Sequence, residues 1–153
     1  MLNKKITVSF IVSIFNKEKY ISLVLEAIFN QKGIKNFEVI VVDDGSTDNS
    51  LKKINKFKKK FNNLHIISQL NNGPSIACNK GLNLAKGYYV KFVDADDILT
   101  PWATKMLIDA LEKNKSVMAF SRNIKTFVKV NNSIKNFYNQ NKVVTPKKFF
   151  AQN

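Results

Sequence analysis

The chain has 153 residues, of which 44% are hydrophobic, so it is long enough to bury a core and too apolar to be intrinsically disordered. Its single cysteine, Cys78, excludes an internal disulfide framework and fits a reducing cytosol. The formal net charge of +14 attracts anionic partners, but no aromatic-rich RNA-binding signature or zinc-finger spacing accompanies it, which argues against nucleic acid.

Strands and helices alternate along residues 6–100. Apolar, β-branched runs predict strands, and apolar residues at helical spacing, bounded by turn signals such as Gly33, predict helices. The predicted strands are 6–15, 37–42, 64–68 and 88–93, and the predicted helices are 17–31, 46–61 and a third from Pro74 or Ser75 to near Gly87. Such alternation predicts an α/β fold with three α/β/α layers around a mostly parallel central sheet.

Past Pro101 the pattern is looser. It predicts a helix at 103–113, strands at 117–120 and 126–130, and the start of a helix at 145–152, as though more chain should follow. The lone His65 has no visible partner in the sequence, so we interpret it as structural.

The cellular location follows from the first and last segments. Residues 6–15 are too short and too often interrupted by hydroxyl side chains to span a membrane, and no cleavage pattern follows them. We therefore expect an unexported, cytoplasmic protein. Residues 101–153 hold ten Lys or Arg against two acids, which would allow peripheral contact with the anionic inner face of a membrane, although no amphipathic anchor is evident. Abundant lysine and asparagine make a compositional bias of the source an equal alternative.

Three carboxylates, Asp94, Asp96 and Asp97, follow the strand at 88–93 within four residues. Like charges this close raise one another's pKa unless a cation or hydrogen bonds compensate. Asp94 and Asp96 can turn onto one hard divalent ion, and an open set of oxygen ligands suits Mg²⁺ or Mn²⁺. The alternative is an acidic turn that caps the helix after Pro101, with Asp97 near its N-terminus.

Polar residues stand at the ends of three predicted strands: Asn16, the pair Asp43–Asp44, and the cluster that begins at Asp94. In parallel sheets ligands bind outside the carboxyl ends of the strands. We therefore expect a binding site at this edge, although Asp43 and Asp44 could instead cap the next helix.

Several motifs, taken together and in order, resemble the nucleotide-sugar half of a family 2 glycosyltransferase with the Rossmann-like GT-A fold. The resemblance covers about residues 8–107, and its most specific parts are Val-Asp-Asp-Gly-Ser-Thr-Asp at 42–48 followed later by Asp-Ala-Asp-Asp at 94–97. The other matching positions are 8–16, Glu18, 20–21, 30–31, 37–41, 72–77, Asn79, Gly81 and 85–87.

The resemblance implies a nucleotide-sugar donor, expected to be a UDP-sugar, with Mg²⁺ or Mn²⁺ on its diphosphate. Asp44 would accept a hydrogen bond from uracil N3–H, a task that suits a carboxylate because it only accepts when ionised. The implied donor contacts are Ser13, Phe15, Glu18, Asp44, Asp94 and Ala95, and the implied metal ligands are Asp94 and Asp96. The sugar would pass, with inversion, to a glycan or lipid-linked acceptor in the synthesis of a cell-surface polysaccharide. Residues 1–113 would form the donor-binding half, and 114–153 a truncated start of the acceptor side.

The sequence departs from the family pattern in three places. Ser13 stands where a proline is usual, and Cys78 where an arginine is common. Past Asp97 the only acids are Asp109 and Glu112, and neither stands where the resemblance would place the general base, so that base is unassigned. The alternatives are therefore an inactive donor-binding remnant, or a basic protein that binds nucleic acid or a membrane surface. A sugar-phosphate nucleotidyltransferase is disfavoured, because the early glycine-rich basic loop is absent.

Overall fold

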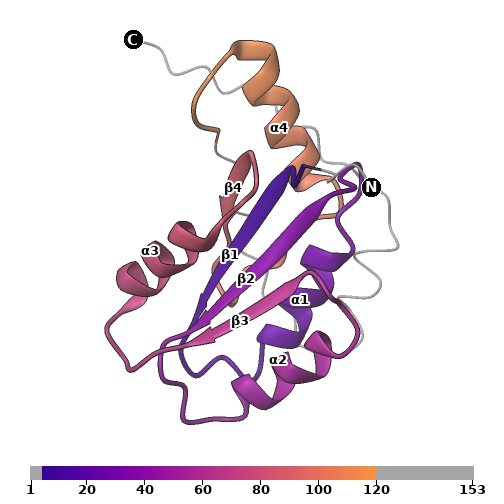
Figure 1. Ribbon diagram of the computed structural model, residues 1–153. Coiled ribbons are helices and arrows are strands. Elements are labelled where there is room, and N and C mark those ends of the chain that lie inside the picture. Colours follow the sequence, from indigo (N-terminus) through magenta and orange to yellow (C-terminus); the bar gives the residue numbers. More distant parts are fainter. Residues whose placement is uncertain (1–4, 120–153) are drawn as a thin grey trace. The chain divides into compact units, whose positions relative to one another are not determined.

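The computed structural model describes residues 5–119. Their core is a parallel four-stranded sheet in the order β3-β2-β1-β4, shown in Figure 1. The strands are β1 (Val8–Ile14), β2 (Phe37–Asp43), β3 (Leu64–Ser68) and β4 (Tyr89–Phe92). The helices are α1 (Ile21–Phe29), α2 (Ser50–Lys58), α3 (Pro74–Leu84) and α4 (Ala103–Asn114). The predicted α/β class and the parallel sheet are confirmed.

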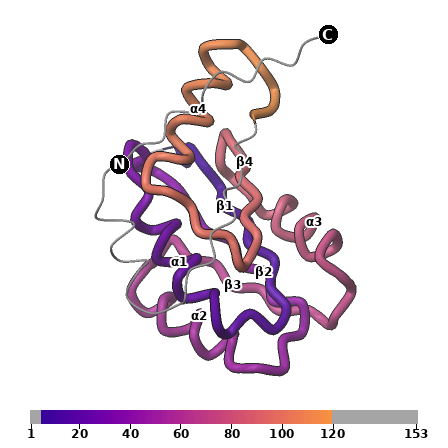
Figure 2. The backbone as a smooth tube through the Cα atoms, turned by 180° about the vertical axis from the view of Figure 1, so that it is seen from behind, coloured from indigo at the N-terminus to yellow at the C-terminus, as the bar shows by residue number. Residues whose placement is uncertain are grey.

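The sheet lies between helices on both faces, which confirms the three layers. Alternate side chains of β1 point to opposite faces, as they must in a strand. Phe10 and Val12 join the core under α1 and α2, which lie side by side in Figure 2. On the other face α3 packs so closely that a Cβ on its Gly81 would lie 2.5 Å from the Ile11 side chain.

The strands were predicted more accurately than the ends of the helices. The predicted helix at 17–31 begins only at Ile21, and the one at 46–61 runs only from Ser50 to Lys58. The described residues 117–119 form no strand, so that part of the prediction is wrong. The predicted elements at 126–130 and 145–152 lie outside the described residues, and the division of the chain at residue 113 stays a prediction.

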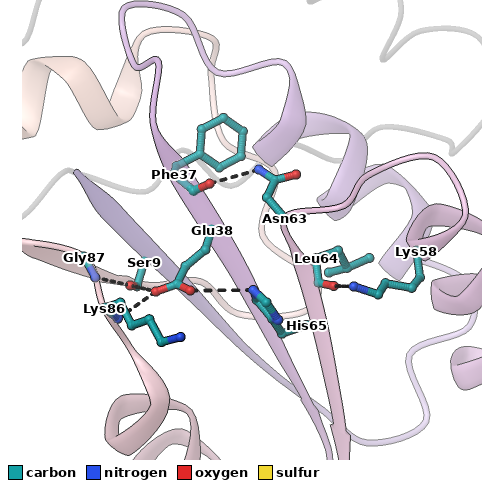
Figure 3. Close-up of polar contacts among 9 residues, drawn as sticks. All are labelled: Ser9, Phe37, Glu38, Lys58, Asn63, Leu64, His65, Lys86 and Gly87. Carbon is teal, nitrogen blue, oxygen red and sulfur yellow. Dashed lines mark hydrogen bonds and ion pairs between the residues drawn. The ribbon is translucent and has the colours of Figure 1, made fainter. Parts of the chain in front are cut away.

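A buried polar network fixes the turn that leads from α3 into β4 (Figure 3). The Glu38 carboxylate is buried and accepts hydrogen bonds from Ser9 Oγ at 2.6 Å and from the Lys86 backbone N–H at 2.7 Å. Gly87 N–H donates to Ser9 Oγ at 2.8 Å, and a Cβ on Gly87 would lie 2.4 Å from the Ser9 nitrogen. Only glycine fits there, so the turn docks directly on the first residues of β1.

His65 also belongs to this end of the sheet. Its Nε2 lies 3.7 Å from Glu38 Oε2, a partner 27 positions away in the chain that local sequence could not reveal. His65 is the second residue of β3, so it stands near the amino ends of the strands. It is thus remote from the carboxyl edge where a ligand site was expected.

Candidate donor-binding site

The loops after β1, β2 and β4 meet around the carboxyl end of β1. On one side, Ile14 pairs with Asp43, and Asp44 N–H donates to the Ile14 carbonyl at 2.8 Å. On the other side, Val93 N–H donates to the Ile11 carbonyl at 2.9 Å, which carries the chain into the acidic turn. The structure therefore brings the expected edge residues together on both flanks of one strand.

Asn16 is the residue that holds the β1–α1 loop to the β2–α2 loop. It has a φ of 51°, in the left-handed region that asparagine tolerates better than most residues. Its Oδ1 accepts the Thr47 backbone N–H at 2.8 Å, and its own N–H donates to Ser46 Oγ at 3.0 Å. The two loops are thus joined through both the side chain and the backbone of Asn16.

Glu18 continues this connection to the start of α2. Its Oε2 accepts hydrogen bonds from the Asn49 backbone N–H at 2.8 Å and from Asn49 Nδ2 at 3.0 Å, and these bonds hold the pKa of Glu18 below its ordinary value. The Glu18 N–H donates in turn to Asp48 Oδ2 at 3.0 Å. Glu18 lies at the expected edge, and its carboxylate there binds the residue that precedes α2.

Asp44 organises the β3–α3 loop. Its buried carboxylate accepts three hydrogen bonds: from Gln69 Nε2 at 2.8 Å, from Asn72 N–H at 2.9 Å and from Gly73 N–H at 2.9 Å. The Asn72 bond and then the Gln69 bond hold the pKa of Asp44 below its ordinary value, against the effect of burial. The alternative that Asp43 and Asp44 cap α2 is wrong, because Asn49 is the N-cap residue of that helix. Asp43 Oδ1 instead accepts a hydrogen bond from Ser46 N–H within the turn, at 3.2 Å.

Ser13 and Phe15 lie at the end of β1, as expected. Phe15 is exposed, whereas Ser13 is half-buried beneath α3, where Cys78 Sγ donates to its hydroxyl at 3.5 Å. The two side chains that depart from the family pattern thus contact each other.

The acidic turn alternates between core and solvent. Val93 and Ala95 are buried in the core, while Asp94 and Asp96 are exposed. The Asp97 backbone N–H donates to the Asp94 carbonyl at 3.0 Å and closes the turn. Both predicted metal ligands are therefore presented at the edge of the sheet.

Asp97 is the half-buried member of the cluster. Burial raises the pKa of its carboxyl above the ordinary value, the charges of Asp94 and Asp96 raise it further, and Lys91 opposes them. The capping alternative for this turn is wrong, because α4 begins after Trp102 and its described N-terminus has no side-chain cap.

Sequence reasoning did not assign Lys17 to the site. Its Nζ lies 2.6 Å from Asp96 Oδ2 and so joins the β1–α1 loop to the acidic turn across 79 positions of sequence. No local signal could have identified this pair.

The acidic turn fits a divalent cation by the chemistry of its donors. Within residues 5–119 no three acidic, His or Cys side chains converge on a closed metal site. Mg²⁺ does not need one, because it keeps waters and is held by one or two carboxylates together with substrate phosphates. Asp94 and Asp96 offer such carboxylates, and Asp96 already holds a cation in the form of the Lys17 ammonium group.

The two acids past Asp97 lie away from this edge. Glu112 accepts a hydrogen bond at 3.0 Å from the hydroxyl of Tyr89, the first residue of β4, and Asp109 pairs with Lys105 on α4. Both belong to the helix beside the amino end of β4, so neither is a base for chemistry at the carboxyl edge.

A parallel α/β sheet with an acidic, loop-built carboxyl edge is the architecture of GT-A glycosyltransferases, and solved structures of that class superpose on this chain. The S. aureus TarS 1–349 complex with UDP-GlcNAc matches with a TM-score of 0.67 and 32% identity, over 79% of this chain and 37% of that one. The mannosyltransferase PcManGT from Pyrobaculum calidifontis, solved with GDP-Man and Mn²⁺, matches with a TM-score of 0.60 and 26% identity, over 68% of this chain and 31% of that one.

Sequence comparison identifies the family. The model of Glycosyl transferase family 2 matches residues 9–152, and the chain belongs to that family. A poly(ribitol-phosphate) β-glucosyltransferase of Bacillus spizizenii is 37% identical over 112 residues, which are 71% of this chain and 18% of that protein. This chain thus spans less than a fifth of that relative's length.

Proposed function

We propose that this glycosyltransferase binds a UDP-sugar at the carboxyl edge of its sheet and transfers the sugar with the help of Mg²⁺ or Mn²⁺. The observation that carries the proposal is the exposed pair Asp94 and Asp96, which stands beside the end of β1 and is linked by Lys17 to the β1–α1 loop. The UDP-GlcNAc complex of the similar TarS structure and the Mn²⁺ complex of the mannosyltransferase support the same assignment.

In this proposal the nucleoside contacts Ser13, Phe15, Glu18, Asp94 and the backbone of Ala95, and the base reaches Asp44. An ionised carboxylate has about four lone-pair sites, and Asp44 uses three of them to hold the β3–α3 loop. One acceptor site therefore remains for uracil N3–H. The same contacts fix the position of that site, because the loop and the carboxylate constrain each other.

Asp94 and Asp96 would hold the divalent cation against the donor diphosphate. When bound, the cation would neutralise the charge that grows on the leaving nucleoside diphosphate. The protein's own contribution is to present two exposed carboxylates on a turn whose intervening residue, Ala95, is buried in the core. We assign no general base, since the two acids past Asp97 lie on α4.

The acceptor is proposed to be a glycan or a lipid-linked glycan at the cell surface, with the reaction on the cytoplasmic side. The poly(ribitol-phosphate) glucosyltransferase supports a polymer acceptor. No helix in the described part of the chain is long and apolar enough to span a membrane. Lys52 and Lys56, which are exposed on α2, and Lys59, which follows the helix, add a basic surface for the proposed peripheral contact with anionic lipid.

Calorimetric titration of the 153-residue chain with UDP, with and without Mn²⁺, tests the proposal. The wild type should bind UDP more tightly when Mn²⁺ is present, and Asp96→Ala should lose this increment. Asp109→Ala is the matched control, because it removes an acid on α4 and should leave UDP binding unchanged. Absence of UDP binding by the wild type, or a metal increment that survives in Asp96→Ala, would refute the proposed site.

A further inference from the structure

The ion pair between Lys17 and Asp96 connects two loops that together form the proposed donor site. The Lys17 side chain is 34% exposed and that of Asp96 is 47% exposed, so both groups remain accessible to ligands. An exposed pair of this kind contributes little to stability, typically below about 1 kcal/mol. The pair is therefore of interest for function rather than for stability, because it places the Lys17 ammonium group on a proposed metal ligand.

The backbone of Lys17 is held in place, so the side chain starts from a fixed point. Lys17 N–H donates at 2.8 Å to Oγ of the fully buried Ser50, the first residue of α2. The neighbours on each side are tied to the same segment, Asn16 through Thr47 and Glu18 through Asn49. The backbone of Lys17 is thus held by bonds that do not involve Asp96, and the side chain reaches the acidic turn from this fixed point.

The acidic turn needs positive charge. Three carboxylates stand within four residues, and Lys91 is the cation that acts on Asp97. Lys91 is itself partly buried, which lowers the pKa of its ammonium group, and it belongs to β4 rather than to a loop. Lys17 supplies positive charge to Asp96 from outside the turn.

We propose that Lys17 positions the donor diphosphate, and that its ammonium group exchanges Asp96 for a diphosphate oxygen when the donor binds. In the free protein its ammonium group occupies Asp96; when a divalent cation binds there with the donor, the ammonium group moves to a diphosphate oxygen. This inference rests on the proposed function. The exchange is electrostatically favourable because the diphosphate brings new negative charge to the place where the carboxylate is neutralised, and charge-assisted bonds to phosphate are among the stronger hydrogen bonds.

The test compares Lys17→Met with Lys19→Met, which removes an exposed lysine of the same loop, and with Lys17→Arg. Paramagnetic broadening of the amide signals of residues 94–97 by Mn²⁺ alone reports on competition for Asp96. In Lys17→Met, half-maximal broadening should occur at an Mn²⁺ concentration about threefold or more below that of the wild type. UDP should bind Lys17→Met about tenfold more weakly at saturating Mn²⁺, a loss that Lys17→Arg largely restores and Lys19→Met does not show.

The outcomes separate the two proposals. Equal Mn²⁺ broadening in the wild type and Lys17→Met, or none in either, would overturn the competition. Tighter Mn²⁺ binding with unchanged UDP affinity would overturn the move to the diphosphate. UDP binding that is equal in all four proteins refutes the role of Lys17 alone, whereas UDP binding by none of them refutes the proposed function and, with it, the role of Lys17.

Discussion

Replacement of Asp44 by asparagine tests whether one carboxylate holds the β3–α3 loop. Asparagine has nearly the same shape, but it has one acceptor oxygen and one donor nitrogen where the carboxylate has two acceptors. If the amide oxygen keeps the bonds from Gln69 and Asn72, the amide nitrogen must face the Gly73 N–H, which loses its partner. The two retained bonds also lose the contribution of the negative charge.

The size of the effect follows from these bonds. A hydrogen bond to a charged group contributes about 1.5–3 kcal/mol, and the half-buried Gly73 donor left without a partner costs less than the roughly 1–3 kcal/mol of a fully buried one. We expect Asp44→Asn to lower the free energy of unfolding by about 2–3 kcal/mol. With an m-value of about 2 kcal/mol/M in urea, the unfolding midpoint should fall by roughly 1–1.5 M.

Urea unfolding followed by circular dichroism measures this change, and Asp109→Asn is the matched surface control. Within residues 5–119 that side chain pairs only with Lys105 on the same helix, so its loss should change stability by less than about 0.5 kcal/mol. Equal midpoints for Asp44→Asn and Asp109→Asn would refute the assignment of Asp44 as the anchor of the loop.

The pH dependence gives a second check on Asp44. Hydrogen bonds from Asn72 and Gln69 hold the pKa of Asp44 below its ordinary value. Its contribution to stability is therefore fully present above the unfolded-state value of about 3.9 and is lost as the pH falls through the folded value. The stability gap between the wild type and Asp44→Asn should be constant near neutral pH and should narrow below about pH 4.

Two further predictions concern the turn between α3 and β4. Gly87→Ala should lower the free energy of unfolding in urea by about 2–3 kcal/mol, because the added Cβ would lie 2.4 Å and 2.7 Å from backbone atoms of Ser9 and Val8 that cannot move aside. Lys86→Ala, a substitution of the exposed neighbouring residue, is the control. An equal loss of stability in the two variants would contradict the close contact at Gly87. Glu38→Ala leaves the Ser9 hydroxyl and the Lys86 N–H without an acceptor and should lower the free energy of unfolding by about 2–4 kcal/mol. Glu38→Gln keeps an acceptor oxygen and should lower it clearly less. Equal losses of stability in the two variants would contradict the network.

Local sequence patterns were sufficient to predict the sheet but not the starts of the helices. The two central strands, β1 and β2, are mostly apolar because both of their faces are covered, and such runs are visible within a few residues. By contrast, the first helix was predicted to begin four residues too early. The backbone N–H groups of Lys17 and Glu18 bind the side chains of Ser50 and Asp48, which lie 33 and 30 positions further along the chain, so the chain forms a turn before α1 begins.

The same distinction applies to the site. Asp44, Asp94 and Asp96 could be proposed as site residues because carboxylates directly after apolar strands are unusual, and the structure brings all three to the two flanks of β1. Their partners could not be identified. Asp44 is held by Gln69 from 25 positions away, and Asp96 pairs with Lys17 from 79 positions away. These contacts depend on how the loops meet, which no local pattern encodes.

The charge balance at the site also has to be judged from the fold. Cys78 stands where an arginine is common in the family, and its thiol, which contacts the Ser13 hydroxyl, brings no positive charge to the edge. Lys17 brings that charge to Asp96 from a different loop, along a backbone fixed by Ser50. A motif position that lacks its usual cation therefore does not by itself argue against donor binding. What matters is whether any cation reaches the acidic turn, and in this protein one does.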